Sequence, residues 1–292
     1  MSSHSGVSRL PANAHWQHFS HEGEAAHFYH ANGFPLSVYE PLLTRLSARL
    51  AISGLACRAT WPGIGQPPRR RDWQLYADDL IDFIEHHYRR PIIGIGHSLG
   101  ATSTILAAAK RPELFKALVL IEPAMVSPGL ARLARCLPKA LMQRTEPARS
   151  TLAKTDRWPS REAFLQQCQQ TRGYRRFGQE TLQALARHAV VEAPDGQVQL
   201  AFPKHWEAHN YTQPPNVMAQ LERLPMPCVA IRGKPSVFFT EQLWQEWQRR
   251  CPRTHFEQDL DHGHLLPLEN PAGCQQLIER GLARIGALRP TA

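Results

Sequence analysis

One pentapeptide, Gly96-His97-Ser98-Leu99-Gly100, places a serine between two glycines in a setting that could make it reactive. Residues 91–96 form a short apolar run typical of a buried strand, and the alanine-rich residues 99–110 are typical of a helix. Flanking glycines let such a strand and helix approach through a tight turn that projects the serine side chain. The amino end of the helix also favours negative charge that develops nearby. The pattern therefore predicts that Ser98 is a nucleophile.

The segments around Ser98 must hold it in place, and they alternate between strand-like and helix-like patterns. Strands are predicted at residues 25–29, 51–57, 91–96, 117–121, 228–232 and about 254–259. Helices are predicted at residues 37–50, 73–88, 99–110, about 240–248 and about 271–288. Strands that alternate with helices of this length indicate an α/β fold, a mostly parallel sheet covered on both faces.

The alternation stops between about residues 123 and 222, where the chain is helical and rich in loops. We therefore expect an α/β core in two parts, residues 1–125 and 223–292, with a helical insert at 126–222.

With these elements in view, the chain resembles the α/β-hydrolase family, in its serine-nucleophile, cap-bearing, esterase- or lipase-like branch. Two further motifs carry this resemblance beside the serine pentapeptide. The loop His30-Ala31-Asn32-Gly33-Phe34-Pro35 is similar to the family's oxyanion loop, and Gly263-His264-Leu265-Leu266-Pro267-Leu268-Glu269-Asn270-Pro271 to its catalytic-histidine segment. The resemblance implies an α/β-hydrolase fold whose central sheet is flanked by helices. The insert would be a helical cap after the family's sixth strand.

The resemblance implies that His264 is the general base. A serine hydroxyl is a weak nucleophile until a neighbouring base accepts its proton, and imidazole has a suitable pKa for this role. His262 is the alternative, but the residues after His264 match the family's segment better. A serine that precedes the histidine also fits the family's order.

The acid that would orient the histidine has several candidates. The family often places an aspartate about three residues beyond the glycine after its seventh strand, where this sequence has Ser236. Some branches carry the acid after the sixth strand instead, which points to Glu122, whose extra methylene could extend its reach. Glu122 could otherwise bind local backbone only. Asp259 and Asp261 are alternatives beside the histidine loop, as is a solvent-borne partner.

Backbone groups would complete the site as an oxyanion hole. One donor is expected to be the N–H of Leu99, directly after the nucleophile. The second comes from the loop that begins at His30. Counting from this histidine gives Asn32, whereas aligning the Gly-Phe-Pro run with the family gives Phe34.

Three aromatic side chains are candidates for substrate binding. Trp206 and Tyr211 belong to the insert and could line a pocket above the serine, or they could pack between helices of the insert. Trp61 lies in the loop after the second predicted strand and could border the same pocket or cover the sheet.

The expected reaction is hydrolysis of a carboxylic ester through an acyl-enzyme, with a small-molecule acyl substrate. Ser98 differs from the carboxylate nucleophile of the family's dehalogenases and epoxide hydrolases, so their chemistry is excluded. Thioester or C–C bond hydrolysis is the alternative within enzymes. A silent member that binds a ligand or a partner is the alternative outside them.

Composition narrows the class of protein further. The net charge is +9, with 28 scattered arginines and no nucleic-acid motif, so we expect no nucleic-acid partner. Six widely spaced cysteines lack zinc spacing, and nothing implies a metal or organic cofactor. No apolar run reaches the ~20 residues of a membrane helix, and the first twenty residues lack the apolar core of a secretory leader. The sequence predicts a cytoplasmic protein.

Overall fold

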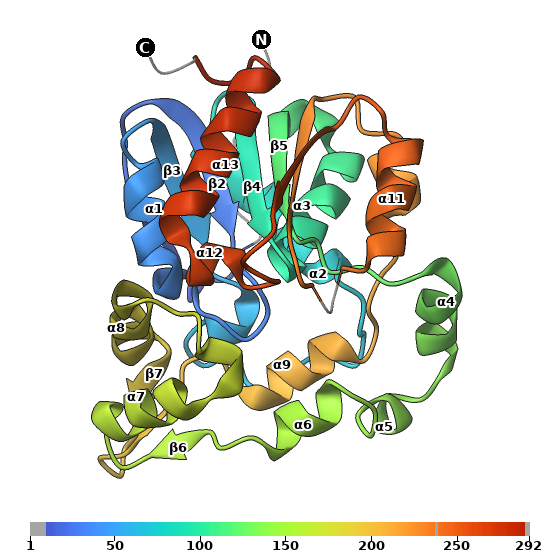
Figure 1. Ribbon diagram of the computed structural model, residues 1–292. Helices are drawn as coiled ribbons and strands as arrows, with labels where there is room; N and C mark the ends of the chain where they lie inside the picture. The colour runs from blue at the N-terminus through green and yellow to red at the C-terminus, as the bar shows by residue number, and fades with distance from the viewer. Residues whose placement is uncertain (1–9, 237–238, 290–292) are drawn as a thin grey trace.

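A seven-stranded sheet forms the centre of the computed structural model, which describes residues 10–236 and 239–289 (Figure 1). Its strands are β1 (Trp16–His18), β2 (Glu24–Tyr29), β3 (Leu50–Leu55), β4 (Ile92–His97), β5 (Phe115–Ile121), β9 (Cys228–Gly233) and β10 (His255–Asp259). They lie in the order β1-β3-β2-β4-β5-β9-β10. β1 pairs antiparallel with β3, and every other neighbouring pair is parallel. The expected mostly parallel sheet is therefore present.

Helices cover both faces of this sheet (Figure 1). One face carries α1 (Glu40–Leu46), α12 (Leu266–Glu269) and α13 (Pro271–Arg284), and the other carries α2 (Gln74–His87) and α3 (Leu99–Lys110). α11 (Glu241–Arg250) lies beside β10, and the rings of Trp244 and Trp247 meet Phe256 edge-on. Covered in this way, β4 and β9 are buried at all six positions, which explains why their sequences are almost continuously apolar.

The chain between β5 and β9 forms a separate layer, drawn below the sheet in Figure 1. Its helices are α4 (Pro128–Cys136), α5 (Lys139–Met142), α6 (Ala148–Ala153), α7 (Arg161–Gln170), α8 (Gln179–His188), α9 (Lys204–Tyr211) and α10 (Met218–Leu221). It also contains a small antiparallel sheet in the order β6-β8-β7, made of β6 (Arg157–Trp158), β7 (Val190–Glu192) and β8 (Val198–Leu200). The predicted insert is thus mainly helical, and its three short strands were not predicted. β5 is the strand that the family resemblance counts as sixth.

Two parts of the first half differ from the sequence-based expectation. β1 was not predicted, because its three residues are all exposed at the sheet edge and carry no apolar alternation. The helix expected at residues 37–50 is a 3₁₀ turn (Leu36–Tyr39) followed by α1, and Leu50 already belongs to β3. Pro41 in the first turn of α1 fits a helix start there.

Some residues used in the sequence argument fall outside the described ranges. Residues 1–9 hold the start of the segment that was searched for a secretory leader. Within residues 10–236 and 239–289, no helix combines the length and apolar character needed to cross a bilayer.

Two buried histidines make the fold sensitive to acid. The Nε2 atom of His27 accepts the N–H of Leu55 at 2.9 Å, and Nε2 of His30 accepts the N–H of Cys57 at 2.7 Å. Burial lowers the pKa of His27 to about 3 and that of His30 to about 4. Both rings are therefore neutral in the folded protein well below pH 6.5.

We expect the free energy of unfolding to fall as the pH drops below about 6.5. In that range the unfolded chain binds protons at these histidines and the folded protein does not, so stability rises with pH. Each histidine contributes a slope of up to about 1.4 kcal/mol per pH unit. Urea denaturation between pH 4.5 and 7.5 would measure the slope. His27→Gln keeps an acceptor for Leu55 but cannot titrate, so its slope should be shallower. An identical slope in both proteins would contradict this origin.

Candidate active site

Ser98 occupies a strained turn between β4 and α3. Its backbone angles are φ 54° and ψ −118°, a conformation that costs energy for any residue with a side chain. The flanking glycines are required by close contacts. A Cβ atom on Gly96 would stand 2.5 Å from the Cα of Ala101, and one on Gly100 would stand 2.0 Å from the carbonyl oxygen of Tyr29. The turn thus has the geometry that the pentapeptide predicted.

Hydrogen bonds to neighbouring segments hold this turn in place. The N–H of Ser98 donates to the carbonyl of Ile121 at 3.0 Å. The Ser98 carbonyl accepts from Thr102 N–H at 3.1 Å and from Ala124 N–H at 3.3 Å. The end of β5 therefore fixes the backbone of Ser98 directly.

Three side chains form a continuous hydrogen-bonded row at the carboxyl ends of the strands. His264 Nε2 lies 3.0 Å from Ser98 Oγ, and His264 Nδ1 lies 3.0 Å from Glu122 Oε2. Because an ionised carboxylate only accepts hydrogen bonds, the proton is assigned to Nδ1, which leaves Nε2 as an acceptor facing the hydroxyl. This arrangement can take a proton from Ser98 Oγ and stabilise the resulting imidazolium.

Glu122 follows β5 directly and has no exposure to solvent. Its φ is 47°, and among the described residues only it and Ser98 combine a side chain with a positive φ. The N–H of Gly233 donates to Glu122 Oε1 at 2.7 Å, and the Ser236 hydroxyl donates to Oε2. With the His264 ring, three donors surround a fully buried carboxylate, as a buried charge requires.

The other acid candidates have different surroundings. Ser236, which stands where the family often has an aspartate, holds Glu122 through its hydroxyl. Asp259 Oδ1 accepts the N–H of Asp261 at 2.8 Å, and the His262 ring at 3.0 Å. Asp261 is exposed. Asp259 is therefore occupied by His262, the alternative base, and the carboxylate placed against His264 is that of Glu122.

A second hydrogen-bonded row ties the three loops of the site together. Tyr39 Oη lies 2.7 Å from His97 Nδ1, and His97 Nε2 lies 2.8 Å from the carbonyl oxygen of His264. The same tyrosine oxygen accepts the N–H of Ala31 at 3.3 Å. Desolvation, with the charge of His264 as a smaller cause, lowers the pKa of His97 to about 3, so the ring is neutral. A neutral ring can accept from Tyr39 and donate to His264 at once.

The loop that begins at His30 lies against the start of α3, as the contact between Gly100 and the His30 carbonyl requires. Asn32 and Phe34 both line a cavity with Ser98. The Asn32 side chain is tied to the insert, since Nδ2 donates to the carbonyl of Glu207 at 3.0 Å and Oδ1 accepts from Asn210 at 2.8 Å. Both backbone N–H groups, of Asn32 and of Phe34, stay candidates for the second oxyanion donor beside that of Leu99.

This cavity has a volume of about 340 Å³ and lies between the core and the insert. Its lining consists of Ala31, Asn32, Phe34, Trp73, Ser98, Ala124, Tyr174, Arg176, Tyr211, Pro235, Gly263, His264, Leu265 and Glu269. The volume falls within the range of small-molecule sites. The reactive row of Ser98 and His264 thus faces a space that one small molecule could fill.

The three aromatic candidates for substrate binding are placed differently. Tyr211, on α9, lines the cavity. Trp61 lies outside the lining, is buried, and donates its indole N–H to the carbonyl of Ala56 at 2.8 Å. Trp206 also lies outside the lining and donates to the carbonyl of Gly65 at 2.8 Å. Both tryptophans donate to carbonyls of the loop after β3, a contact that the sequence analysis did not anticipate.

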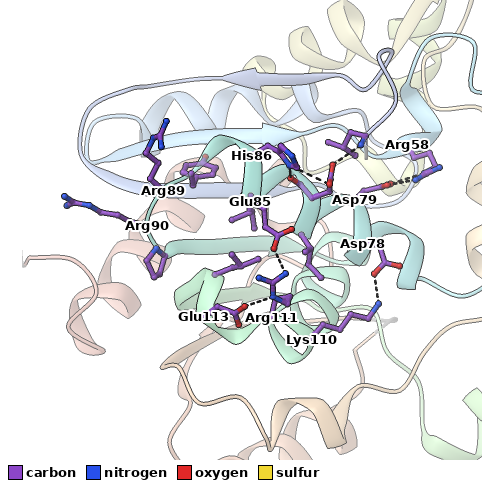
Figure 2. A pocket seen from close by; sticks show the side chains of 17 residues that line it. Arg58, Asp78, Asp79, Glu85, His86, Arg89, Arg90, Lys110, Arg111 and Glu113 are labelled. Carbon is purple, nitrogen blue, oxygen red and sulfur yellow. Dashed lines mark hydrogen bonds and ion pairs between the residues drawn. The ribbon is translucent and has the colours of Figure 1, made fainter. Parts of the chain in front are cut away.

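Figure 2 shows a larger hollow of about 860 Å³ beside α2 and α3. Several of its charged side chains form ion pairs: Arg58 with Asp79, Lys110 with Asp78 at 2.6 Å, and Arg111 with Glu85. Neither Ser98, His264 nor Glu122 lines it. In the described ranges, no group of three or more His, Cys, Asp or Glu side chains is arranged to hold a metal ion. The smaller cavity is therefore the candidate active site.

Comparison with known proteins places this geometry in a family. The sequence profile described as "Alpha/beta hydrolase family" matches residues 27–275. The chain belongs to the alpha/beta hydrolase family. The family and the fold class that the three motifs predicted are therefore confirmed.

Curated relatives of this alpha/beta hydrolase match it only in part. It is 32% identical over 152 residues to the type I acyl-CoA thioesterase mpaH' of Penicillium brevicompactum. This match covers 47% of the chain and 33% of the relative. It is 35% identical over 96 residues to the 2-(acetamidomethylene)succinate hydrolase of Mesorhizobium japonicum. This match covers 32% of the chain and 34% of the relative. The chain thus spans about a third of the length of these relatives.

Solved structures resemble this alpha/beta hydrolase over nearly its whole length. The crystal structure of E-2-(acetamidomethylene)succinate hydrolase aligns with a TM-score of 0.74 at 19% identity, covering 92% of this chain and 94% of the other. The peroxisomal alpha-beta-hydrolase Lpx1 of Saccharomyces cerevisiae aligns with a TM-score of 0.71 at 17% identity. The alignment covers 94% of this chain and 80% of Lpx1. At these identities the likeness concerns the fold.

The sequence analysis missed several residues of the site. Tyr174 and Arg176 come from the insert, and Trp73 precedes α2. Tyr39, which links His97 to the oxyanion loop, also carried no signal. None of these residues belongs to a motif, and only the packing of the insert on the core brings Tyr174 and Arg176 near Ser98.

We expect Glu122→Gln to slow the labelling of Ser98 by a fluorophosphonate by about 10²- to 10⁴-fold, because the imidazolium loses its charged partner. Asp259→Asn is the matched control and should change the rate little. Intact-mass spectrometry at timed intervals would measure both rates. Equal labelling rates for Glu122→Gln and the wild type would contradict a role of Glu122 in activating Ser98.

Tyr39→Phe should leave the His97 ring and the Ala31 N–H without their shared partner. We expect a loss of about 1–3 kcal/mol in the free energy of unfolding, and labelling of Ser98 slowed by up to about 10-fold as the loops shift. Tyr88→Phe, which removes a hydroxyl bonded to Ser53 and to the Ala26 carbonyl, should cost similar stability and leave the labelling rate unchanged. Equal labelling rates in the two folded variants would contradict the positioning role of Tyr39.

Proposed function

We propose that this alpha/beta hydrolase cleaves a carboxylic ester through an acyl-enzyme, with Ser98, His264 and Glu122 as its catalytic triad. The observation that carries the proposal is the unbroken row from Ser98 Oγ through the His264 ring to the buried Glu122, with both separations at 3.0 Å. A serine held in a strained turn at a helix start, facing a cavity of small-molecule size, supports the same role.

The first half-reaction forms the acyl-enzyme. Ser98 Oγ attacks the ester carbonyl while His264 Nε2 takes its proton, and Glu122 stabilises the imidazolium through Nδ1–H. The N–H of Leu99, with that of Asn32 or Phe34, holds the negative charge on the carbonyl oxygen. The C–O bond then breaks, and the alcohol leaves with the proton from His264.

The second half-reaction releases the acid. His264 takes a proton from water, and the resulting nucleophile attacks the acyl carbonyl in the same oxyanion hole. The bond to Ser98 Oγ breaks, and the serine regains its proton from His264. Tyr211 and the rest of the insert, proposed as a cap over residues 126–222, would shape the acyl preference.

Thioester hydrolysis is the second candidate. It is supported by the likeness of about half of the chain to relatives named type I acyl-CoA thioesterases. The same two half-reactions apply, with a thiol as the leaving group. C–C bond cleavage and a silent binding role would use the same cavity without ester turnover.

The deciding experiment compares 4-nitrophenyl butyrate with the thioester S-butyryl-N-acetylcysteamine. We expect kcat/KM to favour the ester, a burst of nitrophenol, and a butyryl group on Ser98 by intact mass, because nitrophenolate leaves readily and the first half-reaction then outpaces the second. Ser98→Ala should abolish burst and adduct. A preference for the thioester would promote the second candidate. If the folded wild-type protein neither hydrolyses these substrates nor becomes acylated, the enzyme proposal is overturned. A catalytically silent protein that binds a ligand or partner is then favoured.

A further inference from the structure

Arg176 brings a positive charge into the cavity that contains Ser98 and His264. It follows the 3₁₀ turn Arg172–Tyr174 of the insert, so it faces the histidine loop from the opposite layer. Its Nη1 atom stands 3.8 Å from where a Cβ atom on Gly263 would lie. A guanidinium is therefore placed next to the residue that precedes the proposed general base.

The guanidinium of Arg176 has little to neutralise it. Its ion-pair partner in the described ranges is Glu269, whose Oε2 lies 3.9 Å away, beyond hydrogen-bond distance. That same oxygen already accepts the N–H of Gly263 at 2.7 Å. No hydrogen bond from the Arg176 guanidinium is found among residues 10–236 and 239–289, and 36% of its side chain is exposed. Its donors point to a partner from outside the chain.

Other arginines in this part of the fold show what a structural role looks like. Nη1 of Arg161 donates to three backbone carbonyls, those of residues 186, 187 and 190. Arg71 donates to the carbonyls of residues 135, 137 and 212 and so ties its loop to the insert. Arg176 does neither, although it is nearer to the reactive serine's cavity than both.

Two more arginines extend the charge outward. Arg172, Gly173, Arg175, Arg176 and Glu269 line an open hollow of about 330 Å³. This hollow shares Arg176 and Glu269 with the cavity of Ser98. Three cations and one carboxylate therefore line this outer hollow. The hollow of Figure 2, by contrast, is lined by five Arg or Lys and five Asp or Glu side chains, so its formal charges balance.

Resting on the proposed function, we propose that this alpha/beta hydrolase prefers acyl substrates that carry an anionic group, bound by Arg176 in the active-site cavity. A guanidinium offers paired donors that match the two oxygens of a carboxylate or phosphate. Arg172 and Arg175, which line the adjoining open hollow, raise the local concentration of such anions beside the cavity. The anion is either a carboxylate on the acyl chain or a phosphate on the leaving group, and the two share this recognition.

The test uses two pairs of substrates that differ in charge. 4-Nitrophenyl hemisuccinate and 4-nitrophenyl butyrate have acyl chains of equal length, ending in a carboxylate or a methyl group. Butyryl-coenzyme A and S-butyryl-N-acetylcysteamine carry one acyl group on a charged or a neutral thiol. For each pair the readout is the ratio of kcat/KM for the anionic and the neutral member, in the wild type, Arg176→Gln, Arg176→Lys and the control Arg144→Gln. Arg144 is exposed, lies in the same insert and lines neither hollow.

We expect the wild type to favour the anionic member of at least one pair. Arg176→Gln should lower that ratio by about 10- to 100-fold, since a hydrogen bond to a charged group is lost, and Arg176→Lys should lower it less. Arg144→Gln should keep the wild-type ratio. A change confined to the nitrophenyl pair places the anion on the acyl chain, and one confined to the thioesters places it on the leaving group. Equal ratios in Arg176→Gln and Arg144→Gln would overturn the proposal.

Binding to Ser98→Ala separates this inference from the proposed function. Titration calorimetry with 4-nitrophenyl hemisuccinate and butyryl-coenzyme A needs no turnover. Binding of either compound that weakens at least about 10-fold when Arg176→Gln is added supports the anion site, even where the wild type hydrolyses nothing. Ester turnover by the wild type, together with anion binding that Arg176→Gln does not change, keeps the proposed function and rejects the anion site.

Discussion

The buried carboxylate of Glu122 is the constraint on which the rest of the site depends. A charge without contact to water is tolerated only where donors replace the solvent, and three donors do so here: the Gly233 N–H, the Ser236 hydroxyl and the His264 ring. They come from the end of β9, from the loop after it and from the loop after β10. One side chain therefore requires three strand ends to meet at one edge of the sheet. Parallel strands supply such an edge, because their carboxyl ends all point the same way.

Hydrogen bonds from neighbouring segments stabilise the strained backbone of Ser98 and Glu122. Ser98 and Glu122 both adopt a positive φ, which costs free energy that the surrounding hydrogen bonds must offset. The two residues are coupled through β5, since the N–H of Ser98 binds Ile121, directly before Glu122. The row through Tyr39 and His97 then fixes the histidine loop against the oxyanion loop. Ser98, the loop of His264 and the loop that begins at His30 are thus positioned by connected hydrogen bonds.

The insert decides what the site can hold. Buried polar contacts fasten α9 to the core: Tyr76 and Asn32 both bind the side chain of Asn210, and the Trp73 indole binds its carbonyl. This attachment sets Tyr211 in the cavity, while Tyr174 and Arg176 reach it from the turn before α8. The two parts of the chain therefore contribute differently to the cavity. The core supplies the hydrogen-bonded row and most of the cavity lining, and the insert adds Tyr174, Arg176 and Tyr211.

The α/β core, the turn at Ser98 and the segment of His264 could be predicted from the sequence, because their patterns are largely local. Gly96 is required by its close contact with Ala101 just beyond the turn, and the buried parallel strands β4 and β9 are almost continuously apolar. The acid stayed open between Glu122 and other carboxylates, because reach between strand ends is a tertiary property. Trp61 and Trp206 looked like pocket residues but donate to backbone carbonyls elsewhere. Arg176 carried no sequence signal, since an arginine's role depends on what faces it, and only the packing of insert on core decided that.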